Sequence, residues 1–181
     1  MISYSTPTYF ISGHRNITDQ EFYFHYVPKI NEAMKEGAAF VIGDYYGVDQ
    51  KAQDYLKEKR YDKSKVVIYH MLDKPKYCVW EHTRSGFTSD EERDNAMTFD
   101  SNEDIAWVRT SQEESGTAQN IARRVIYKMS IDVLRRKLEL EDEIKNIEKF
   151  NGLFSKVEET IKKEWKQVSK EYIDEKSLEK T

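Results

Sequence analysis

Cysteine is almost absent from this sequence, since Cys78 is the single one among 181 residues. One thiol can form neither an intramolecular disulfide nor a thiolate zinc site, and such a composition fits a reducing compartment. Long apolar runs are also missing, which predicts no membrane-spanning helix. The first residues lack the basic start and apolar stretch of a secretory signal. We therefore expect a cytoplasmic protein with no membrane partner.

The chain has no excess of basic residues either. Lys and Arg number 29, Asp and Glu number 33, and the formal net charge is −4. A general nucleic-acid binder needs a basic surface to neutralise phosphates, so this class of function is disfavoured, although a local basic pocket stays open. Acidic and basic residues are equally numerous from Ile126 to the end, so the acidic excess lies within residues 1–125. This contrast divides the sequence into two regions.

The first region shows a regular alternation of short apolar runs and helical segments. The runs predict buried strands at residues 8–12, 38–42, 65–70 and 104–108. Helices are expected at about 18–35, 48–59 and 91–97, and from residue 117 onward. Pro28 should kink or delay the first of them. Such alternation predicts a Rossmann-like α/β domain over residues 1–125, with helices on both faces of a parallel sheet.

The second region, residues 126–181, is predicted to be a charged amphipathic helical extension. Apolar residues recur at intervals of three or four from Leu140 to Tyr172. Asn151 and Gly152 interrupt this pattern and predict a helix end or a hairpin turn, so we expect a long helix with a break or a helical hairpin. The apolar stripe needs the sheet domain, its own second half or another subunit as partner. We favour a homo-oligomer, because the first domain already has helices for both sheet faces.

The region between residues 71 and 89 has no clear periodicity. A segment of this length is usually functional or disordered. Its aromatic content argues against disorder and favours a lid. His25, His70 and His82 are scattered without the spacing of a metal site. The glycines match neither the dinucleotide fingerprint nor the P-loop. We therefore predict no metal and no cofactor.

Glycine-bearing loops follow three of the four predicted strands, where a parallel sheet binds its ligands. Their candidate ligand-binding residues are Gly13, His14, Arg15, Gly43, Asp44, Gly47, Asp49, Ser115, Gly116 and Thr117. Backbone amides at such loops and at helix N-termini attract anions. Arg15 could pair with a phosphate, while His14 could donate a hydrogen bond or act as a base. Asp49 could accept ribose hydroxyls, or it could only cap the following helix.

The loop before the last predicted helix also has two interpretations. Gly116 lets a ligand approach the backbone closely, and the hydroxyls of Ser115 and Thr117 can donate to phosphate oxygens. The commoner role of such hydroxyls is simply to cap a helix. In the preceding helix Arg93 and Met97 lie four residues apart on one face. Arg93 could stabilise a phosphate there, or form a surface ion pair with Glu91 or Asp90 that contributes little to stability.

Together these residues resemble the SLOG superfamily, which joins nucleotide-sensing Rossmann-like domains with the LOG phosphoribohydrolases. LOG enzymes carry the motif x-R-K-x-x-M on a helix, followed by a strand and P-G-G-x-G-T-x-x-E. Arg93 and Met97 match the first motif, with Asp94 in place of lysine, and residues 115–117 match part of the second. The loop at 43–49 resembles the G-x-x-x-G-x-D loop of the YspA- and YpsA-like branch.

The resemblance covers residues 9–124 and implies a small-molecule nucleotide ligand. It departs from the enzymes at the position of their catalytic glutamate, which is Asn120 here. Asparagine can hydrogen-bond a ribose hydroxyl but cannot serve as a carboxylate base. Glu92 or Glu114 could substitute for it from nearby.

Three functions follow from these observations. The first is a binding module that senses or sequesters a nucleotide-derived signal, as domains it resembles are implicated in nucleotide-signalling conflicts between bacteria and phages. The second is an N-glycosidase for nucleoside monophosphates, in which Arg93 would hold the phosphate and Asp49 the ribose, with Glu92 or Asp94 supplying the carboxylate. The third is an assembly protein that works through its helical extension.

Overall fold

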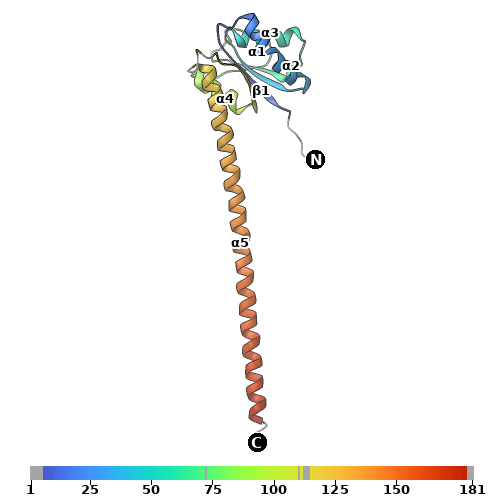
Figure 1. Cartoon of the computed structure of the whole chain (residues 1–181), viewed down its shortest axis with the longest axis vertical. Helices are drawn as coiled ribbons and strands as arrows, with labels where there is room; N and C mark the ends of the chain where they lie inside the picture. Colours follow the sequence, from blue (N-terminus) through green and yellow to red (C-terminus); the bar gives the residue numbers. More distant parts are fainter. Residues whose placement is uncertain (1–5, 72, 110, 112–114, 179–181) are drawn as a thin grey trace. The chain divides into compact units, whose positions relative to one another are not determined.

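A five-stranded parallel sheet forms the centre of the first part of the chain in the computed structural model (Figure 1). The strands are β1 (Thr8–Ser12), β2 (Ala39–Gly43), β3 (Val66–Tyr69), β4 (Thr83–Arg84) and β5 (Glu103–Ala106). They lie in the order β4-β3-β2-β1-β5, and every neighbouring pair is parallel. The predicted α/β fold with a parallel sheet is confirmed.

The structure describes residues 6–71, 73–109, 111 and 115–178, with side chains described up to 164 and at 166. Its helices are α1 (Asp19–His25), α2 (Val27–Lys35), α3 (Val48–Glu58), α4 (Asp90–Phe99) and α5 (Gly116–Leu178), with a short 3₁₀ turn η1 (Lys63–Lys65). Contacts within the chain divide it into two units, Met1–Lys128 and Met129–Thr181.

The two faces of the sheet have separate apolar cores. Because side chains alternate along a strand, Ile11 and Ile42 point to one face and Phe10 and Val41 to the other. Helices α1, α2 and α3 pack on the first face, where the buried set includes Phe22, Ile30 and Leu56. Met97 of α4 packs on the second face with Phe10, Val41 and Tyr69. The sheet is thus covered on both sides, as its continuous apolar strands require.

The first predicted helix is divided in two. Thr18 caps α1 by accepting a hydrogen bond from the Glu21 backbone N–H, and the Glu21 carboxylate accepts one from the Thr18 N–H in return. The chain then turns at Tyr26, and Pro28 occupies the first turn of α2. Proline fits there because the N–H it lacks would have no partner in that turn.

The region 71–89 contains a strand that the sequence did not predict. β4 has two residues and lies parallel to β3. The preceding segment is anchored by the fully buried Gln53, whose amide donates to the Gly43 carbonyl and accepts from the Val79 backbone N–H. A strand of two residues is too short to show any periodicity, so its pairing partner decides its conformation.

Helix α5 runs through Asn151 and Gly152 without interruption, so the expectation of a break or a turn there was wrong. Gly152 in a helix interior costs only about 1 kcal/mol relative to alanine, which is too little to end a long helix. Side chains from 128 to 164 are exposed in the single chain. None of the described helices is long and apolar enough to cross a membrane.

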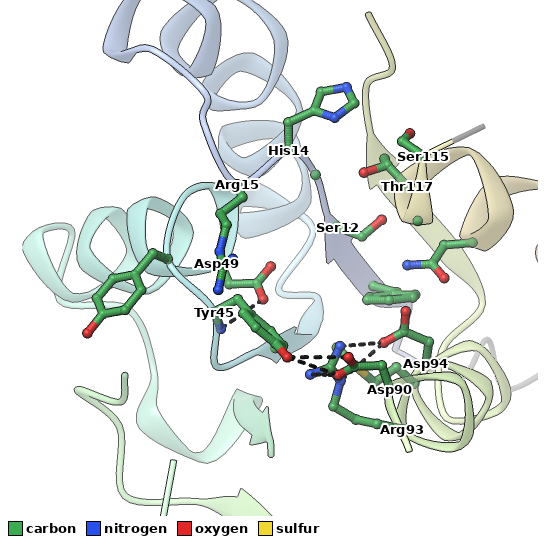
Figure 2. A pocket seen from close by; sticks show the side chains of 17 residues that line it. Ser12, His14, Arg15, Tyr45, Asp49, Asp90, Arg93, Asp94, Ser115 and Thr117 are labelled. Carbon is green, nitrogen blue, oxygen red and sulfur yellow. Dashed lines mark hydrogen bonds and ion pairs between the residues drawn. The ribbon is translucent and has the colours of Figure 1, made fainter. Parts of the chain in front are cut away.

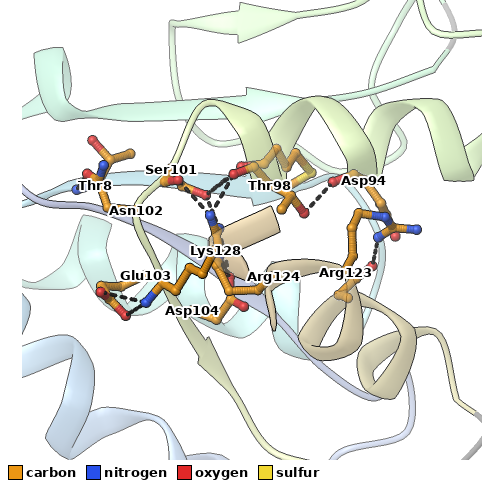
Figure 3. Close-up of polar contacts among 12 residues, drawn as sticks. Thr8, Asp94, Thr98, Ser101, Asn102, Glu103, Asp104, Arg123, Arg124 and Lys128 are labelled. Atoms are coloured by element: carbon orange, nitrogen blue, oxygen red, sulfur yellow. Dashed lines mark hydrogen bonds and ion pairs between the residues drawn. The ribbon is translucent and has the colours of Figure 1, made fainter. Parts of the chain in front are cut away.

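The first turns of α5 are held to the sheet unit by a buried arginine. Arg124 donates to the carbonyl oxygens of Thr98 and Ser101, both at 2.7 Å, and to the carboxylate of Asp104 (Figure 3). Lys128 adds an ion pair with Glu103 at 2.9 Å. Arg124 therefore fixes where α5 begins relative to α4 and β5.

Candidate functional site

A cavity of about 470 Å³ lies at the carboxyl ends of β1 and β2 and beside the start of α5. Strands β2, β3 and β4 follow one another on one side of β1, whereas β5 pairs with the other edge of β1. Such a reversal of strand order is where open α/β sheets usually bind ligands. The volume is in the range of small-molecule sites.

Most residues predicted to bind or act on a ligand line this cavity. They are Gly13, His14, Arg15, Gly43, Asp49, Arg93, Asp94, Met97, Ser115, Gly116, Thr117 and Asn120. They come from the loop after β1, the end of β2, the residue before α5, and helices α3, α4 and α5, which are far apart in the sequence. Figure 2 shows Asp49, Arg93 and Thr117 around the same space.

Two glycines in these loops cannot be replaced by larger residues. A Cβ on Gly13 would lie 2.2 Å from Val48 Cγ2. Gly47 has a φ of +94°, and a Cβ there would lie 2.4 Å from the Arg15 carbonyl oxygen. The loops after β1 and β2 are therefore packed directly against each other, which brings Arg15 and Asp49 to one side of the cavity.

The end of β1 presents an unpaired hydroxyl to the cavity. The Ser12 side chain is 6% exposed, and its Oγ has no hydrogen-bond partner within the described structure. It lies between Asp49 and Thr117 in Figure 2. The backbone here is fixed by Tyr26, whose hydroxyl donates to the Ser12 carbonyl and accepts from the Trp107 N–H. A buried polar atom without a partner is uncommon, and a ligand could supply the partner.

His14 is buried in a structural role. Its Nε2 accepts a hydrogen bond from the backbone N–H of Arg109 at 3.0 Å. Burial, together with the nearby Arg109 charge, lowers the pKa of His14. The ring is therefore neutral at pH 7, and the proton resides on Nδ1. Through Nε2, His14 holds the segment after β5 and is not free to act as a base.

Asp49 lies on the wall of the cavity near the start of α3. Its Oδ2 accepts a hydrogen bond from the Tyr45 backbone N–H at 3.2 Å. Burial raises the pKa of Asp49 to about 7, and the neighbouring carboxylates of Asp94 and Asp44 act in the same direction. The Gly43 position leaves room for this carboxyl group, since a Cβ there would meet Asp49 Oδ2 at 2.3 Å. Asp49 can thus carry a proton near neutral pH.

Arg93 is buried among three aspartates. It donates two hydrogen bonds to Asp94 Oδ1, at 3.1 and 2.8 Å. Its Nη1 lies 3.2 Å from Asp90 Oδ1 and 3.5 Å from Asp44 Oδ1. The ion pair with Asp90 that the sequence suggested is present; the Asp90 side chain is 57% exposed, but the Arg93 side chain is only 8% exposed, so Arg93 itself is not a surface residue. Arg93 is therefore largely neutralised by the protein itself.

Tyr45 forms an aromatic wall beside these charges. Arg15, Lys76 and Arg93 each place a cationic group within 5.4 Å of its ring centre. Its hydroxyl lies 3.3 Å from both carboxylate oxygens of Asp90. These contacts orient Arg15 and Arg93 around one ring. Unlike Arg93, Arg15 forms no ion pair with a carboxylate of the described residues, so its charge is available to an anion.

The start of α5 contributes both a cap and two lining side chains. Ser115 Oγ accepts from the Ala118 N–H at 3.3 Å, so this hydroxyl caps the helix. Thr117 and Asn120 are each buried and line the cavity. The Asn120 side-chain oxygen accepts a hydrogen bond from Arg123. The helix N-terminus gives this side of the cavity a partial positive charge.

Some predicted residues do not line the cavity. Glu92 faces away and accepts hydrogen bonds from the N–H and hydroxyl of Thr88, both at 2.7 Å. Asp44 lies behind Arg93 and accepts from the Lys76 backbone N–H at 2.8 Å. Gly47 shapes the loop without lining the cavity. Glu114 lies outside the described residues.

Sequence reasoning missed five lining residues, which are Phe10, Ser12, Tyr45, Tyr46 and Asp90. Ser12 could have been found as the last polar residue of a strand that leads into a predicted loop. The two tyrosines lie inside the predicted loop at 43–49, but nothing in the sequence indicates which way their rings point.

No group of three or more His, Cys, Asp or Glu side chains with metal-binding geometry occurs in the described part of the chain. Comparison with protein-family models, curated proteins and solved structures found no match to this chain. Its function has to be argued from the geometry of the cavity.

Proposed function

We propose that the cavity binds a nucleotide or a nucleotide-derived signalling ligand, and that the protein acts as a sensor or a sequestering protein. The observation that carries this proposal is the convergence of three strand-end loops on one cavity. The cavity is lined by Arg15 and the first turn of α5 and also by the carboxyl groups of Asp49 and Asp94, and a nucleotide has an anionic phosphate attached to a hydroxyl-bearing sugar.

The phosphate is expected between Arg15 and the start of α5, which lie across the cavity from each other in Figure 2. Gly116 and Thr117 are in the first turn of that helix, where backbone N–H groups have no partner within the helix. An anion there gains from these donors and from the helix dipole. Arg15 adds a full positive charge from the opposite loop.

The sugar is expected near the carboxyl groups of Asp49 and Asp94. Asp49 and Asp94 can accept hydrogen bonds from ribose hydroxyls, and the unpaired Ser12 hydroxyl can complete a third contact. Because Arg93 is already bound by aspartates, its role in this proposal is to hold Asp94 and Asp90 in place rather than to bind phosphate. Asn120 can hydrogen-bond a sugar hydroxyl but cannot act as a base, which favours binding without cleavage.

The test is calorimetric titration with the four ribonucleoside monophosphates, followed by denaturation and mass spectrometry of the released ligand. We expect binding of at least one nucleotide and recovery of that nucleotide unchanged. Arg15→Ala should weaken binding at least tenfold, whereas Arg136→Ala, on the exposed part of α5, should not change it. Equal affinity in all three proteins, or no binding of any nucleotide, would contradict the proposal.

One observation favours a second candidate, an N-glycosidase. The cavity holds two carboxyl groups in different environments: Asp49, with its pKa raised to about 7 by burial, and Asp94, which is paired with Arg93. A carboxyl group that can carry a proton, placed in the same cavity as a second carboxylate, is the usual arrangement for acid–base and charge stabilisation at a glycosidic bond. Asp49 could protonate the leaving base, while Asp94 would stabilise positive charge on the ribose.

This candidate is tested by incubating the protein with each nucleoside monophosphate and measuring free base. Activity that falls at least 100-fold in Asp94→Asn but persists in Glu92→Gln would support it, because Glu92 faces away from the cavity. If base release is undetectable in the native protein, the binding function alone stands.

A further inference from the structure

The part of α5 beyond Lys128 has an apolar residue at every seventh position. This heptad stripe consists of Val133, Leu140, Ile147, Phe154 and Ile161, and the sequence continues it at Val168. The first five side chains are between 48% and 68% exposed. Large apolar side chains in a regular row need to be covered by something, since leaving them in water forgoes the free energy of burial.

The spacing indicates what covers the stripe. A straight α-helix has 3.6 residues per turn, so a strict seven-residue repeat drifts by about 20° per heptad around it. Over the four intervals of the stripe this drift would reach about 80°. The row stays in contact with a partner only if two helices wind around each other with the same repeat. A second copy of this chain supplies that same repeat.

The uninterrupted course of α5 excludes one alternative. A stripe can also be covered by its own second half, but this requires a turn, and α5 continues as helix from Gly116 to Leu178. Asn151 therefore does not mark a turn, and its position relative to the stripe suggests another role. It lies four residues after Ile147 and three before Phe154, on the side of the stripe. A polar asparagine in the seam of a coiled coil fixes register and favours two parallel helices, in which the two asparagines meet.

The charged flanks are compatible with pairing of identical chains. Ion pairs run along the helix between Arg135 and Asp132, between Lys137 and Glu141, and between Lys145 and Asp142. Residues of both signs therefore occur beside the stripe, and the segment as a whole has no excess of one sign that would repel a second copy.

We propose that residues 129–164 pair with the same segment of a second copy as a parallel, in-register, two-stranded coiled coil. This inference does not depend on the ligand of the cavity. It makes the protein a homodimer whose sheet units are each joined to a common helical stem through α5.

The first measurement is the mass of the full chain by size-exclusion chromatography with light scattering. We expect twice the chain mass of 21.5 kDa at micromolar concentration. A monomer over the whole accessible concentration range, or a larger assembly, would overturn the proposal.

A matched pair of double variants tests the stripe itself. Leu140→Glu with Ile147→Glu places two charges in the seam and should raise the dissociation constant of the dimer at least 100-fold. Leu138→Glu with Lys145→Gln makes the same change in net charge on the opposite face and should leave the dimer intact. Dimerisation that responds equally to both variants, or to neither, would place the interface elsewhere.

Orientation and register are tested by single cysteines in a Cys78→Ser background. In a parallel, in-register pair, L140C and I161C should each form an intermolecular disulfide under mild oxidation. In an antiparallel pair, each of these cysteines would lie far from the same cysteine of the other helix, so neither would cross-link. The latter result, in a protein that is still dimeric, would overturn the parallel arrangement.

Discussion

Residues of the same kind are buried in the sheet unit but exposed in the helical segment beyond Lys128. Ile42 in the sheet is fully buried, whereas Ile147 in the helix is 59% exposed. Arg124 is buried against Asp104, whereas Arg135 and its partner Asp132 are both largely exposed. The difference shows that the sheet unit buries its apolar side chains within one chain, while those of the helical segment stay exposed in the single chain and would be covered by the proposed coiled coil.

The largest expected difference between the two regions concerns arginine. Arg124→Ala should destabilise the sheet unit by roughly 3–5 kcal/mol, because it leaves the half-buried Asp104 carboxylate and two carbonyl groups without their donor. Arg135→Ala should change stability by less than about 1 kcal/mol, because its ion pair is exposed to water. Urea unfolding followed by tryptophan fluorescence measures both. Similar losses of stability in Arg124→Ala and Arg135→Ala would contradict the contrast between a buried and an exposed ion pair.

Glycine gives the second comparison. Gly47→Ala should cost about 3 kcal/mol or more, because its φ is +94° and the new Cβ would collide with backbone carbonyl oxygens of His14 and Arg15. Backbone atoms cannot move aside without disturbing the loops that form the cavity. The same urea unfolding series gives the change in free energy. A variant of native stability would show that these loops are less tightly joined than their distances indicate.

The third prediction concerns pH and the cavity wall. Burial raises the pKa of Asp49 from 3.8 to about 7, so folding favours its protonated form. The stabilisation from that proton is full below pH 4 and is lost as pH rises through 7. Asp49→Asn should therefore stabilise the protein by about 2 kcal/mol at pH 8, a value discounted for partial exposure, and have little effect near pH 4. Unfolding curves that show the same difference at both pH values would contradict this account.

The smallest effect is expected in the helical segment. Gly152→Ala should stabilise α5 by about 1 kcal/mol, since alanine has the higher helix propensity and a Cβ there meets no atom within 4 Å. The substitution should increase helical circular dichroism on heating or in mild denaturant. A loss of helix signal would instead indicate that Gly152 is needed for a close approach between helices.

Much of the fold was predictable because its patterns are local. The apolar runs ending at Ser12 and Gly43 predicted two of the central strands, and their glycine-bearing loops predicted where a cavity would form. The two-residue β4 was not predictable, because its conformation depends on pairing with β3 rather than on its own sequence. The helix end expected at Asn151 was wrong, because a local turn signal was weaker than the helix propensity on either side of it.

The site was predictable in its composition but not in its pairing. The sequence placed Arg93 near Asp90 and Asp94 simply because they share one helix turn. It could not indicate that Asp44, from another loop, would complete the cluster around Arg93. A phosphate was therefore predicted as a partner of Arg93. Glu92 and Asp94 are equally close to Arg93 in sequence, and only the rotation of α4 decides that Asp94 faces the cavity.

By itself the sequence determined four of the five strands, the covering of both sheet faces and the seven-residue repeat of α5, because these follow from local spacing of apolar residues. The tertiary structure alone decided that the Ser12 hydroxyl has no partner among the described residues, that Asp49 is desolvated and that Arg93 is neutralised by its neighbours. Each of these properties is set by atoms from separate loops, and their distances exist only once the strands have been arranged in the sheet.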